Sequence, residues 1–386
     1  MTLSRRSLLG SLLAAPALRA APGEPLVLPA RRNDFHQLLV PARIENSPVL
    51  WCELDTGGGG PLVFIDAAHA AALGIQPTFV GRSAGAVEGA LAPDWRSRVN
   101  LSMAGLKFPG QEVVIKAAPL PGDKDASIGM LVLQAFVVEL DHDATAIRLH
   151  DPAGFKYSGP GRSFDFTMQD NNPFTTATLT LRGGQRVEAK MVIDTGAVAS
   201  LAYFSQSFAS QNRLAERAVA TAPDTMGRTA CRIERFALGP LGVDRPVVHA
   251  FGAPGFGGMA EPDGMIPADF LRRFRVFMDY SRSRMILEPN RSYADPPAFD
   301  ASGLRVHRLP NAPDTMRIYE VLPGTPASEA GVRSGDLLAT LDDVPMQRMS
   351  PGMVQEALTR EGRDTALLLQ RGDEILNVRL KLRRLL

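Results

Sequence analysis

The sequence predicts a mainly β protein made of two similar lobes, with a smaller α+β module at its C-terminal end. The tripeptide Asp-Thr-Gly occurs at residues 55–57 and again at 194–196, each time at the end of an apolar, strand-like run. Three further landmarks recur 138 residues later in the chain: Ile128 and Ile266, Asp141 and Asp279, Leu149 and Leu287. Constant offsets over about a hundred residues indicate a duplicated unit. A Pro-containing stretch at 291–300 then precedes a different pattern.

Composition limits the classes of function that need to be considered. A chain of 386 residues is longer than one ordinary core. Its 45% apolar and 22% charged residues, with 35 Gly and 30 Pro, fit a globular protein rich in turns and strands. A net charge of +1 gives no reason to expect a nucleic acid or an anionic membrane as partner. The six His and the two Cys (Cys52 and Cys231) show no metal-ligand spacing, so we expect neither a metal nor a cofactor. We expect each Cys to be a small core or flap residue rather than half of a disulfide.

The N-terminal segment resembles a bacterial twin-arginine export signal. Arg5 and Arg6 precede the apolar run 8–18, which is too short to span a bilayer, and small residues follow at 17–21. We therefore expect residues 1–21 to be a signal peptide, and the protein to be periplasmic or secreted without stable membrane insertion. The alternative is a disordered basic tail.

The two lobes are expected to repeat one layout. In the first lobe we expect strands at 37–43, 49–54, 99–103 and 112–115, and a helix at 65–73. In the second we expect strands at 176–181, 187–193, 247–250, 274–280 and 285–288, and a helix at 204–212. The expected segments are 1–21 (signal), 22–155 (first lobe), 156–290 (second lobe), 291–299 (linker) and 300–386 (C-terminal module).

Over residues 26–290 the chain resembles the retropepsin-like aspartic peptidases, in a two-lobed, single-chain form. The resemblance implies two pseudo-symmetric acid-protease β-barrel lobes whose Asp55 and Asp194 form a catalytic dyad. It also implies that Thr56 and Thr195 hold the two loops by hydrogen bonds between the lobes. Residues 81–92 and 224–235 lie where the family carries flaps, and the first of these segments is equally compatible with a surface loop.

The duplicated carboxylates suit amide hydrolysis. A buried carboxylate costs several kcal/mol unless it is satisfied or used. Two carboxyls about 3 Å apart share one proton, so one can accept a proton from water while the other donates to the scissile carbonyl. Gly57 and Gly196 allow the tight turn and the close backbone approach. Because the pair titrates as a unit, the sequence does not assign the base.

Two positions depart from the family pattern. Gly58 and Ala197 stand where pepsin-like enzymes have a hydroxyl residue that stabilises the carboxylate. With fewer hydrogen bonds to the charged form, the carboxyl pKa should be higher and the dyad should work nearer neutral pH. Pro267 stands where Gly is usual in the apolar-apolar-Gly segment. Because Pro lacks an N–H and fixes φ, it leaves the local geometry of the second lobe open.

Residues 300–386 resemble a bacterial PDZ module. Thr325, Pro326 and Gly331 predict the cap, first turn and end of a short helix. A second helix is expected over 350–362, and 376–382 alternates as a closing strand.

In PDZ modules a loop before the first strand offers backbone N–H groups to a peptide's terminal carboxylate, and the peptide then adds to the sheet edge. Gly303-Leu304 is the candidate loop here. The alternative is a module that only packs against the lobes.

These resemblances imply an aspartic endopeptidase that acts as a monomer on peptide or protein substrates, with a PDZ module for C-terminal peptides. One alternative is a degenerate peptidase scaffold that binds peptides without cutting them. Another is a homodimer in which each chain supplies one lobe, which two copies in one chain make unnecessary.

Overall fold

The computed structural model describes residues 24–60, 62–84, 91–117, 120, 124–198, 200–223, 228–252, 262–309 and 312–386. The predicted export signal lies outside these residues, as do 85–90 of the first flap candidate and 224–227 of the second.

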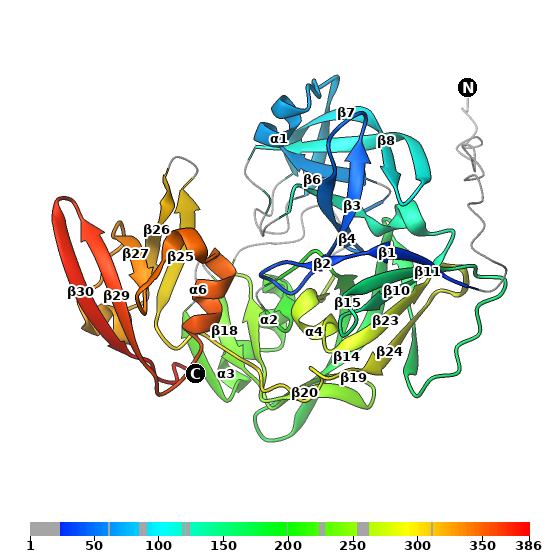
Figure 1. The fold of residues 1–386 in the computed structure, drawn as a ribbon. Helices are drawn as coiled ribbons and strands as arrows, with labels where there is room; N and C mark the ends of the chain where they lie inside the picture. Colours follow the sequence, from blue (N-terminus) through cyan, green and yellow to red (C-terminus); the bar gives the residue numbers. More distant parts are fainter. Residues whose placement is uncertain are drawn as a thin grey trace, which may run out of the picture.

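The first lobe is an eight-stranded sheet (Figure 1). In sheet order its strands are β2 (Arg31–Arg32), β3 (Leu38–Ile44), β4 (Leu50–Asp55), β9 (Ala126–Gly129), β5 (Leu62–Asp66), β8 (Leu106–Lys116), β7 (Leu91–Met103) and β6 (Phe79–Ala84). β3 also pairs with β7, so the sheet turns back on itself like a barrel. Helix α1 (Ala67–Ala72) and the 3₁₀ turn η1 (Met130–Leu133) complete the lobe.

The second lobe is a ten-stranded sheet with the same plan. Its strands, in sheet order, are β17 (Ala220–Pro223), β18 (Thr229–Arg232), β21 (Val247–Ala250), β16 (Tyr203–Phe204), β22 (Gly264–Pro267), β15 (Gln185–Asp194), β14 (Asn172–Leu181), β19 (Arg235–Leu238) and β20 (Leu241–Asp244), and β13 (Thr167–Gln169) pairs with β14. Its helices are α2 (Gln206–Gln211), α3 (Leu214–Arg217) and α4 (Ala268–Leu271). The helix predicted over 204–212 is thus shorter, and α3 was not predicted.

Helix α1 and helix α2 begin in the same way in the two lobes. The Asp66 carboxylate accepts the His69 N–H at 2.9 Å, and the Ser205 hydroxyl accepts the Phe208 N–H at 3.2 Å. Each side chain satisfies a backbone donor that has no partner within its helix.

A third sheet joins the lobes. Its strand order is β1 (Leu26–Pro29), β11 (Ala146–His150), β10 (Val137–Asp141), β23 (Phe274–Asp279), β24 (Arg284–Pro289) and β12 (Arg162–Asp165), and the 3₁₀ turn η3 (Tyr280–Arg282) connects β23 to β24. Three strands come from each half, and β10 pairs antiparallel with β23 at the centre. β1 and β12 occupy equivalent outer positions, and neither was predicted.

The duplication is confirmed by strand register. β4 runs parallel to β9 with Asp55 opposite Gly129, and β15 runs parallel to β22 with Asp194 opposite Pro267. The strands predicted at 37–43 and 49–54 pair as the hairpin β3–β4, and those predicted at 176–181 and 187–193 pair as β14–β15. Both flap candidates fall in hairpins, β6–β7 and β17–β18, whose tips lie outside the described residues.

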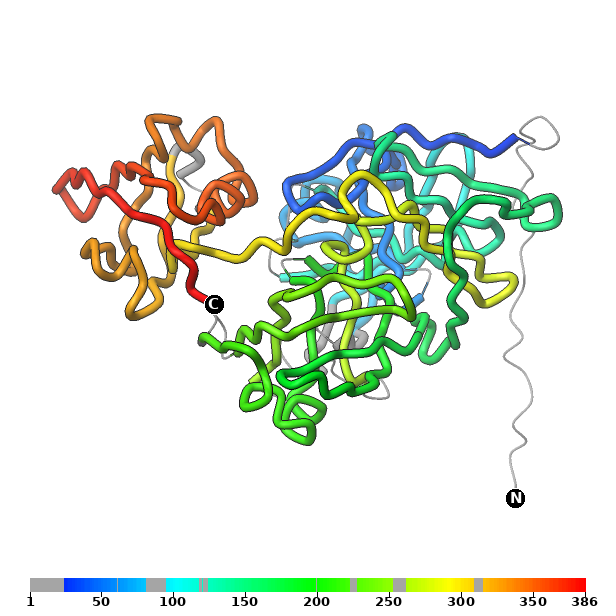
Figure 2. Tube along the Cα trace, turned by 90° about the horizontal axis from the view of Figure 1, so that it is seen from below, coloured from blue at the N-terminus to red at the C-terminus, as the bar shows by residue number. Residues whose placement is uncertain are grey.

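The C-terminal module has a sheet of its own, ordered β25 (Leu304–Leu309), β26 (Ala312–Val321), β27 (Leu337–Leu341), β29 (Asp364–Arg371) and β30 (Glu374–Lys381), with β28 (Val344–Pro345) paired to β27. Its helical segments are α5 (Pro326–Glu329), η4 (Met346–Arg348) and α6 (Pro351–Ala357). Figure 2 shows this module beside the two-lobed part, joined to it by a single segment. Ser350 caps α6, which ends five residues before the predicted 362.

The hydrophobic cores follow this division. One continuous cluster of buried side chains runs through both lobes, and a separate cluster fills the C-terminal module. The predicted linker 291–299 is nevertheless fastened to the second lobe. The buried Arg273 guanidinium donates to the carbonyl oxygens of Ser292, Tyr293 and Asp295 at 3.3, 3.2 and 2.6 Å. These bonds hold the segment against the second lobe.

Candidate active site

The two Asp-Thr-Gly loops each orient their own carboxyl. Asp55 ends β4, and its Oδ1 accepts the Gly57 N–H at 2.8 Å. Asp194 ends β15, and its Oδ1 accepts the N–H groups of Gly196 and Ala197, both at 2.9 Å. A carboxylate at the end of a strand is thus met by the backbone donors of the turn that follows it.

The two carboxyls also meet each other. A Cβ placed on Gly57 would lie 2.4 Å from the Asp194 Cγ, and one placed on Gly196 would lie 2.6 Å from the Asp55 Cγ. Each loop's glycine is therefore packed directly against the carboxyl of the other loop. Any larger residue at either glycine position would clash with that carboxyl. The two carboxyls lie close enough that each influences the pKa of the other.

Thr56 and Thr195 bind the loops reciprocally across the lobes. The Thr56 N–H donates to Thr195 Oγ1 and the Thr195 N–H donates to Thr56 Oγ1, both at 3.0 Å. The Thr56 hydroxyl donates to the Ile193 carbonyl and the Thr195 hydroxyl to the Leu54 carbonyl, both at 2.6 Å. These four bonds are buried, so breaking one would leave a polar group without a partner.

Burial raises the pKa of Asp55 above its usual value, and Lys124 opposes that rise. Burial also raises the pKa of Asp194 well above its usual value, and the negative charge of Asp55 adds to the rise. The direction agrees with the sequence-based expectation of a dyad that works nearer neutral pH. The main cause is burial rather than the missing hydroxyl group, since Ala197 still supplies a backbone donor.

Four residues near the dyad were not assigned a role from the sequence. Glu53 and Lys124 form a buried ion pair, with Oε1 and Nζ 2.5 Å apart. Burial raises the pKa of Glu53 to about 7 against the opposing charge of Lys124. Gln37 Nε2 donates to the carbonyls of Thr195 and Gly196 at 3.0 and 3.2 Å.

Asn33 in turn donates to Gln37 Oε1 at 2.9 Å, which fixes the amide that holds the second loop. The only signal for this set in the sequence is Glu53, a charged residue within an apolar run.

Pro267 fits the second lobe without distortion. It caps α4 with φ −83°, which its ring allows, and the next N–H, that of Ala268, donates to the Ala197 carbonyl at 2.9 Å. In the first lobe the equivalent Gly129 is required, because a Cβ there would lie 2.0 Å from the Gly60 carbonyl oxygen. This position thus requires Gly in the first lobe and accommodates Pro in the second.

The candidate carboxylate loop of the PDZ module has its backbone donors engaged by its own side chains. The Gly303 N–H donates to Asp300 Oδ2 at 2.8 Å, and the Leu304 N–H donates to the Ser302 hydroxyl at 3.0 Å. Both residues are buried. Both donors are used within the loop, so a peptide carboxylate would have to displace the Asp300 and Ser302 side chains, and the binding role of Gly303 and Leu304 stays a prediction.

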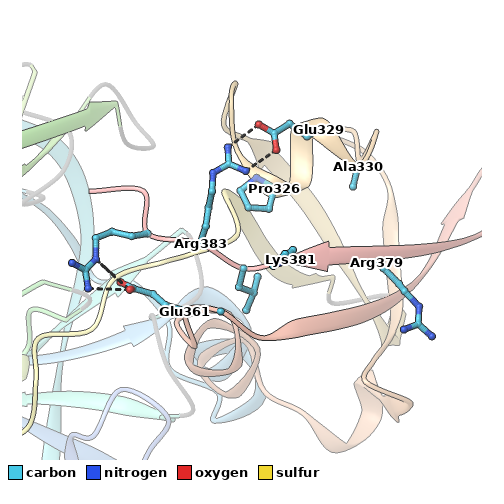
Figure 3. Close-up of a pocket in the computed structure, with 10 residues that line it drawn as sticks. Pro326, Glu329, Ala330, Glu361, Arg379, Lys381 and Arg383 are labelled. Carbon is cyan, nitrogen blue, oxygen red and sulfur yellow. Dashed lines mark hydrogen bonds and ion pairs between the residues drawn. The ribbon is translucent and has the colours of Figure 1, made fainter.

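A concave site of about 750 Å³ lies elsewhere on the module, between α5 and the end of β30 (Figure 3). Arg383 forms two hydrogen bonds with Glu329, at 2.6 and 2.7 Å. Arg384 is likewise paired with Glu361 at 3.0 Å. These side chains neutralise one another at the surface, so the site offers no proton-transfer chemistry comparable to that of the dyad.

Within the described ranges, no group of three or more His, Cys, Asp or Glu is arranged to hold a metal ion. None of the helices in that part of the chain is long and apolar enough to cross a membrane. Cys52 and Cys231 are both buried free thiols.

Comparison with known proteins identifies one part of the chain. Residues 317–371 match the family model of the PDZ domain. A search of curated proteins finds no match. Among solved structures, the chain is similar to the aspartic proteinase from Irpex lacteus, with a TM-score of 0.44 and 12% sequence identity over 70% of this chain and 99% of that one. The fold assignment of the lobes stands on the strand pairing and register described above.

Proposed function

We propose that the protein is an aspartic-type endopeptidase that hydrolyses peptide bonds with a water activated by Asp55 and Asp194. The observation that carries the proposal is the contact between each loop's glycine and the opposite carboxyl, because two half-buried carboxyls then lie together. A pair of this kind holds one proton and presents an acid and a base to the same substrate atom.

The chemistry follows from that shared proton. The ionised carboxylate removes a proton from a water molecule, whose oxygen attacks the carbonyl carbon of the substrate. The protonated carboxyl donates its proton to the carbonyl oxygen, which gives a tetrahedral intermediate. Transfer of a proton to the amide nitrogen then breaks the C–N bond and restores the carboxyl pair. The threonine bonds across the lobes support this role because they fix the separation of the two carboxyls.

The intact pair favours the enzyme over the two alternatives. A scaffold that only binds peptides has no need for two adjoining carboxyls, each with raised pKa. A homodimer that shares its dyad is unnecessary, since one chain supplies both loops. The proposal is tested by exposing the protein to an unbiased peptide library and comparing it with the Asp194→Asn variant. Peptide binding without cleavage by the wild type would favour the binding alternative.

We also propose that the PDZ module selects substrates and supports the dyad. A Cβ on Gly352, in α6, would lie 2.4 Å from the Asp34 Cβ, so the module's helix rests on the 33–37 segment of the first lobe. Gln37 of that segment donates to the second catalytic loop. The module is therefore linked to Asp194 through one short stretch of chain.

Deletion of residues 300–386 should affect short and long peptides differently. We expect kcat on short peptides to fall several-fold, because the Gln37 segment loses its support. Substrates long enough to reach the module should also show a raised KM, since the second site no longer increases their effective concentration. kcat and KM are measured for both substrate lengths, after circular dichroism shows that the truncated protein is folded. Unchanged kinetics on both substrates would contradict both roles.

We propose further that residues 1–21 direct export through the twin-arginine route. The double substitution Arg5→Lys and Arg6→Lys should leave the precursor in the cytoplasm, because that route reads the guanidinium pair. Cell fractionation and immunoblotting measure the distribution. Normal delivery of the double variant outside the cytoplasm would point to the general secretory route.

A further inference from the structure

A buried ion pair lies beside one member of the dyad and not the other. Glu53 is two residues before Asp55 in β4, so both side chains leave the same face of the strand. The side chains of Glu53 and Lys124 are 3% and 2% exposed, and their charged atoms are 2.5 Å apart. A lysine with so little contact with water keeps its charge only where a carboxylate is close.

The duplicated fold shows that this pair breaks the symmetry of the site. Asp125 and Asp263 are equivalent, because Asp125 accepts the Trp51 N–H at 2.7 Å and Asp263 accepts the Lys190 N–H at 2.8 Å. The residues just before these two aspartates are Lys124 and Pro262.

The same comparison applies to the strand that carries each catalytic carboxyl. Glu53 pairs with Ser127 in the first lobe, and the corresponding pair in the second is Val192 with Met265. The charged pair of the first lobe is thus replaced by Val192 and Pro262 in the second.

The charges of the pair act on the two carboxyls with opposite effect. After burial, the largest influence on the Asp55 pKa is Lys124, which lowers it. For Asp194, the negative charges of Asp55 and Glu53 both add to the rise in pKa that burial causes. Tyr280 also interacts electrostatically with Asp55. Burial raises its phenol pKa further above the usual value, so it stays neutral.

We propose that Glu53 and Lys124 are positioning residues that polarise the dyad, holding the negative charge on Asp55 and the proton on Asp194. The assignment of roles rests on the proposed peptidase function. Asp55 then takes the proton of the attacking water as the C–O bond forms, and Asp194 gives its proton to the carbonyl oxygen. On collapse, Asp55 returns its proton to the departing nitrogen, the C–N bond breaks, and Asp194 recovers a proton from the intermediate's hydroxyl. Both carboxyls end as they began.

The placement of the proton is measured without any substrate. In the Asp194→Asn protein Asp55 titrates alone, and in the Asp55→Asn protein Asp194 titrates alone. ¹³C NMR of aspartate carboxyl carbons follows each titration, and the resonance of interest is identified by its loss in the double Asn variant. We expect Asp55 to ionise at lower pH than Asp194. The reverse order would overturn the proposal.

Substitutions in the pair distinguish an electrostatic role from a structural one. Lys124→Met should raise the pH at which Asp55 titrates by about one unit, whereas Glu53→Gln, which keeps the cation, should leave it unchanged or lower. If the ion pair were merely structural, both substitutions would shift the pH at which Asp55 titrates in the same direction, and that result would overturn the proposal. If Lys124→Met does not fold, the double variant Glu53→Gln/Lys124→Met removes both charges and should bring the two titrations closer together.

Lys190→Met is the matched control, because Lys190 belongs to the second lobe and its ammonium donates to Gln169 at 2.5 Å. It should change neither titration, and a shift equal to that of Lys124→Met would contradict a specific role for Lys124. In the active protein the acid limb of kcat/KM should move with the Asp55 titration. A wild type that cleaves no peptide would refute the proposed function alone, because the NMR titrations still decide where the proton resides.

Discussion

Asp55→Asn or Asp194→Asn is expected to lower kcat/KM for peptide hydrolysis about a thousandfold or more while the protein stays folded. Asn keeps the size of the side chain and can accept the loop's backbone hydrogen bonds, but it cannot take up or release the proton. The measurement is the cleavage rate of the best peptide from the library, with circular dichroism as a check of the fold. An Asp194→Asn protein with wild-type activity would refute the dyad.

Asp194→Asn should also change the pH dependence of the free energy of unfolding. A carboxyl whose pKa is raised by folding makes the folded state bind protons more tightly than the unfolded state. The wild type should therefore lose stability relative to Asp194→Asn as the pH rises from about 4, the ordinary Asp value, through the folded pKa. Urea unfolding at several pH values measures this difference.

Asp336→Asn in the PDZ module is the matched control, because its effect should have the opposite sign. Burial acts to raise the Asp336 pKa, but hydrogen bonds from Arg371 and the Arg333 N–H prevail, and the pKa is lowered. The wild type should thus gain stability over Asp336→Asn as the pH rises through the folded pKa. The same pH dependence in the two Asn variants would show that folding does not raise the pKa of Asp194.

The sequence predicted best what is local or repeated. The strands beside each Asp-Thr-Gly loop, β3–β4 and β14–β15, lie within a few residues of their predicted bounds. Their apolar runs end at turn residues. The constant offset between the two halves also meant that each strand was predicted twice, once in each lobe. The carboxyl pair followed from the same repeat, because two equivalent loops in a two-fold arrangement approach each other at the axis.

The sheet that joins the lobes could not be predicted in the same way. β1 and β12 have four residues each, too few to show a period, and β10 finds its partner β23 in the other half of the chain. Pairing over such separations depends on how the two halves dock, which no local pattern encodes.

Polar contacts made across loops were equally hidden. Lys124 follows no periodic segment, and its ion pair with Glu53 forms only because β9 pairs with β4. The hydrogen bonds within the Gly303-Leu304 loop were not predicted either, and their cause is local. Asp300 and Ser302 are turn-forming residues whose side chains take the N–H groups that a peptide would need.

Gly57→Ala and Gly196→Ala should each reduce kcat about a hundredfold or more, although a methyl group is the smallest possible addition. Neither glycine has a positive φ, so alanine brings no backbone strain at these positions. The added carbon would instead lie 2.4 Å from the Asp194 Cγ in the first case and 2.6 Å from the Asp55 Cγ in the second. The carboxyl must then move by about an ångström, a misplacement that can cost a hundredfold in rate.

The clash is with a side chain of the opposite loop, so the effect should fall on the chemistry and not on the fold. We expect kcat to fall with little change in KM, because substrate contacts away from the carboxyls remain. Gly154→Ala is the control, since a Cβ there meets nothing within 4 Å. It should retain full activity. Full activity in all three variants would mean that the exchange of Gly for Ala is tolerated in the Asp-Thr-Gly loops as well, and would contradict the prediction. Separated carboxyls repel each other less, so the basic limb of the pH profile should also move to lower pH in Gly57→Ala. A drop in kcat without that movement would mean that the methyl group blocks the substrate and leaves the carboxyl pair in place.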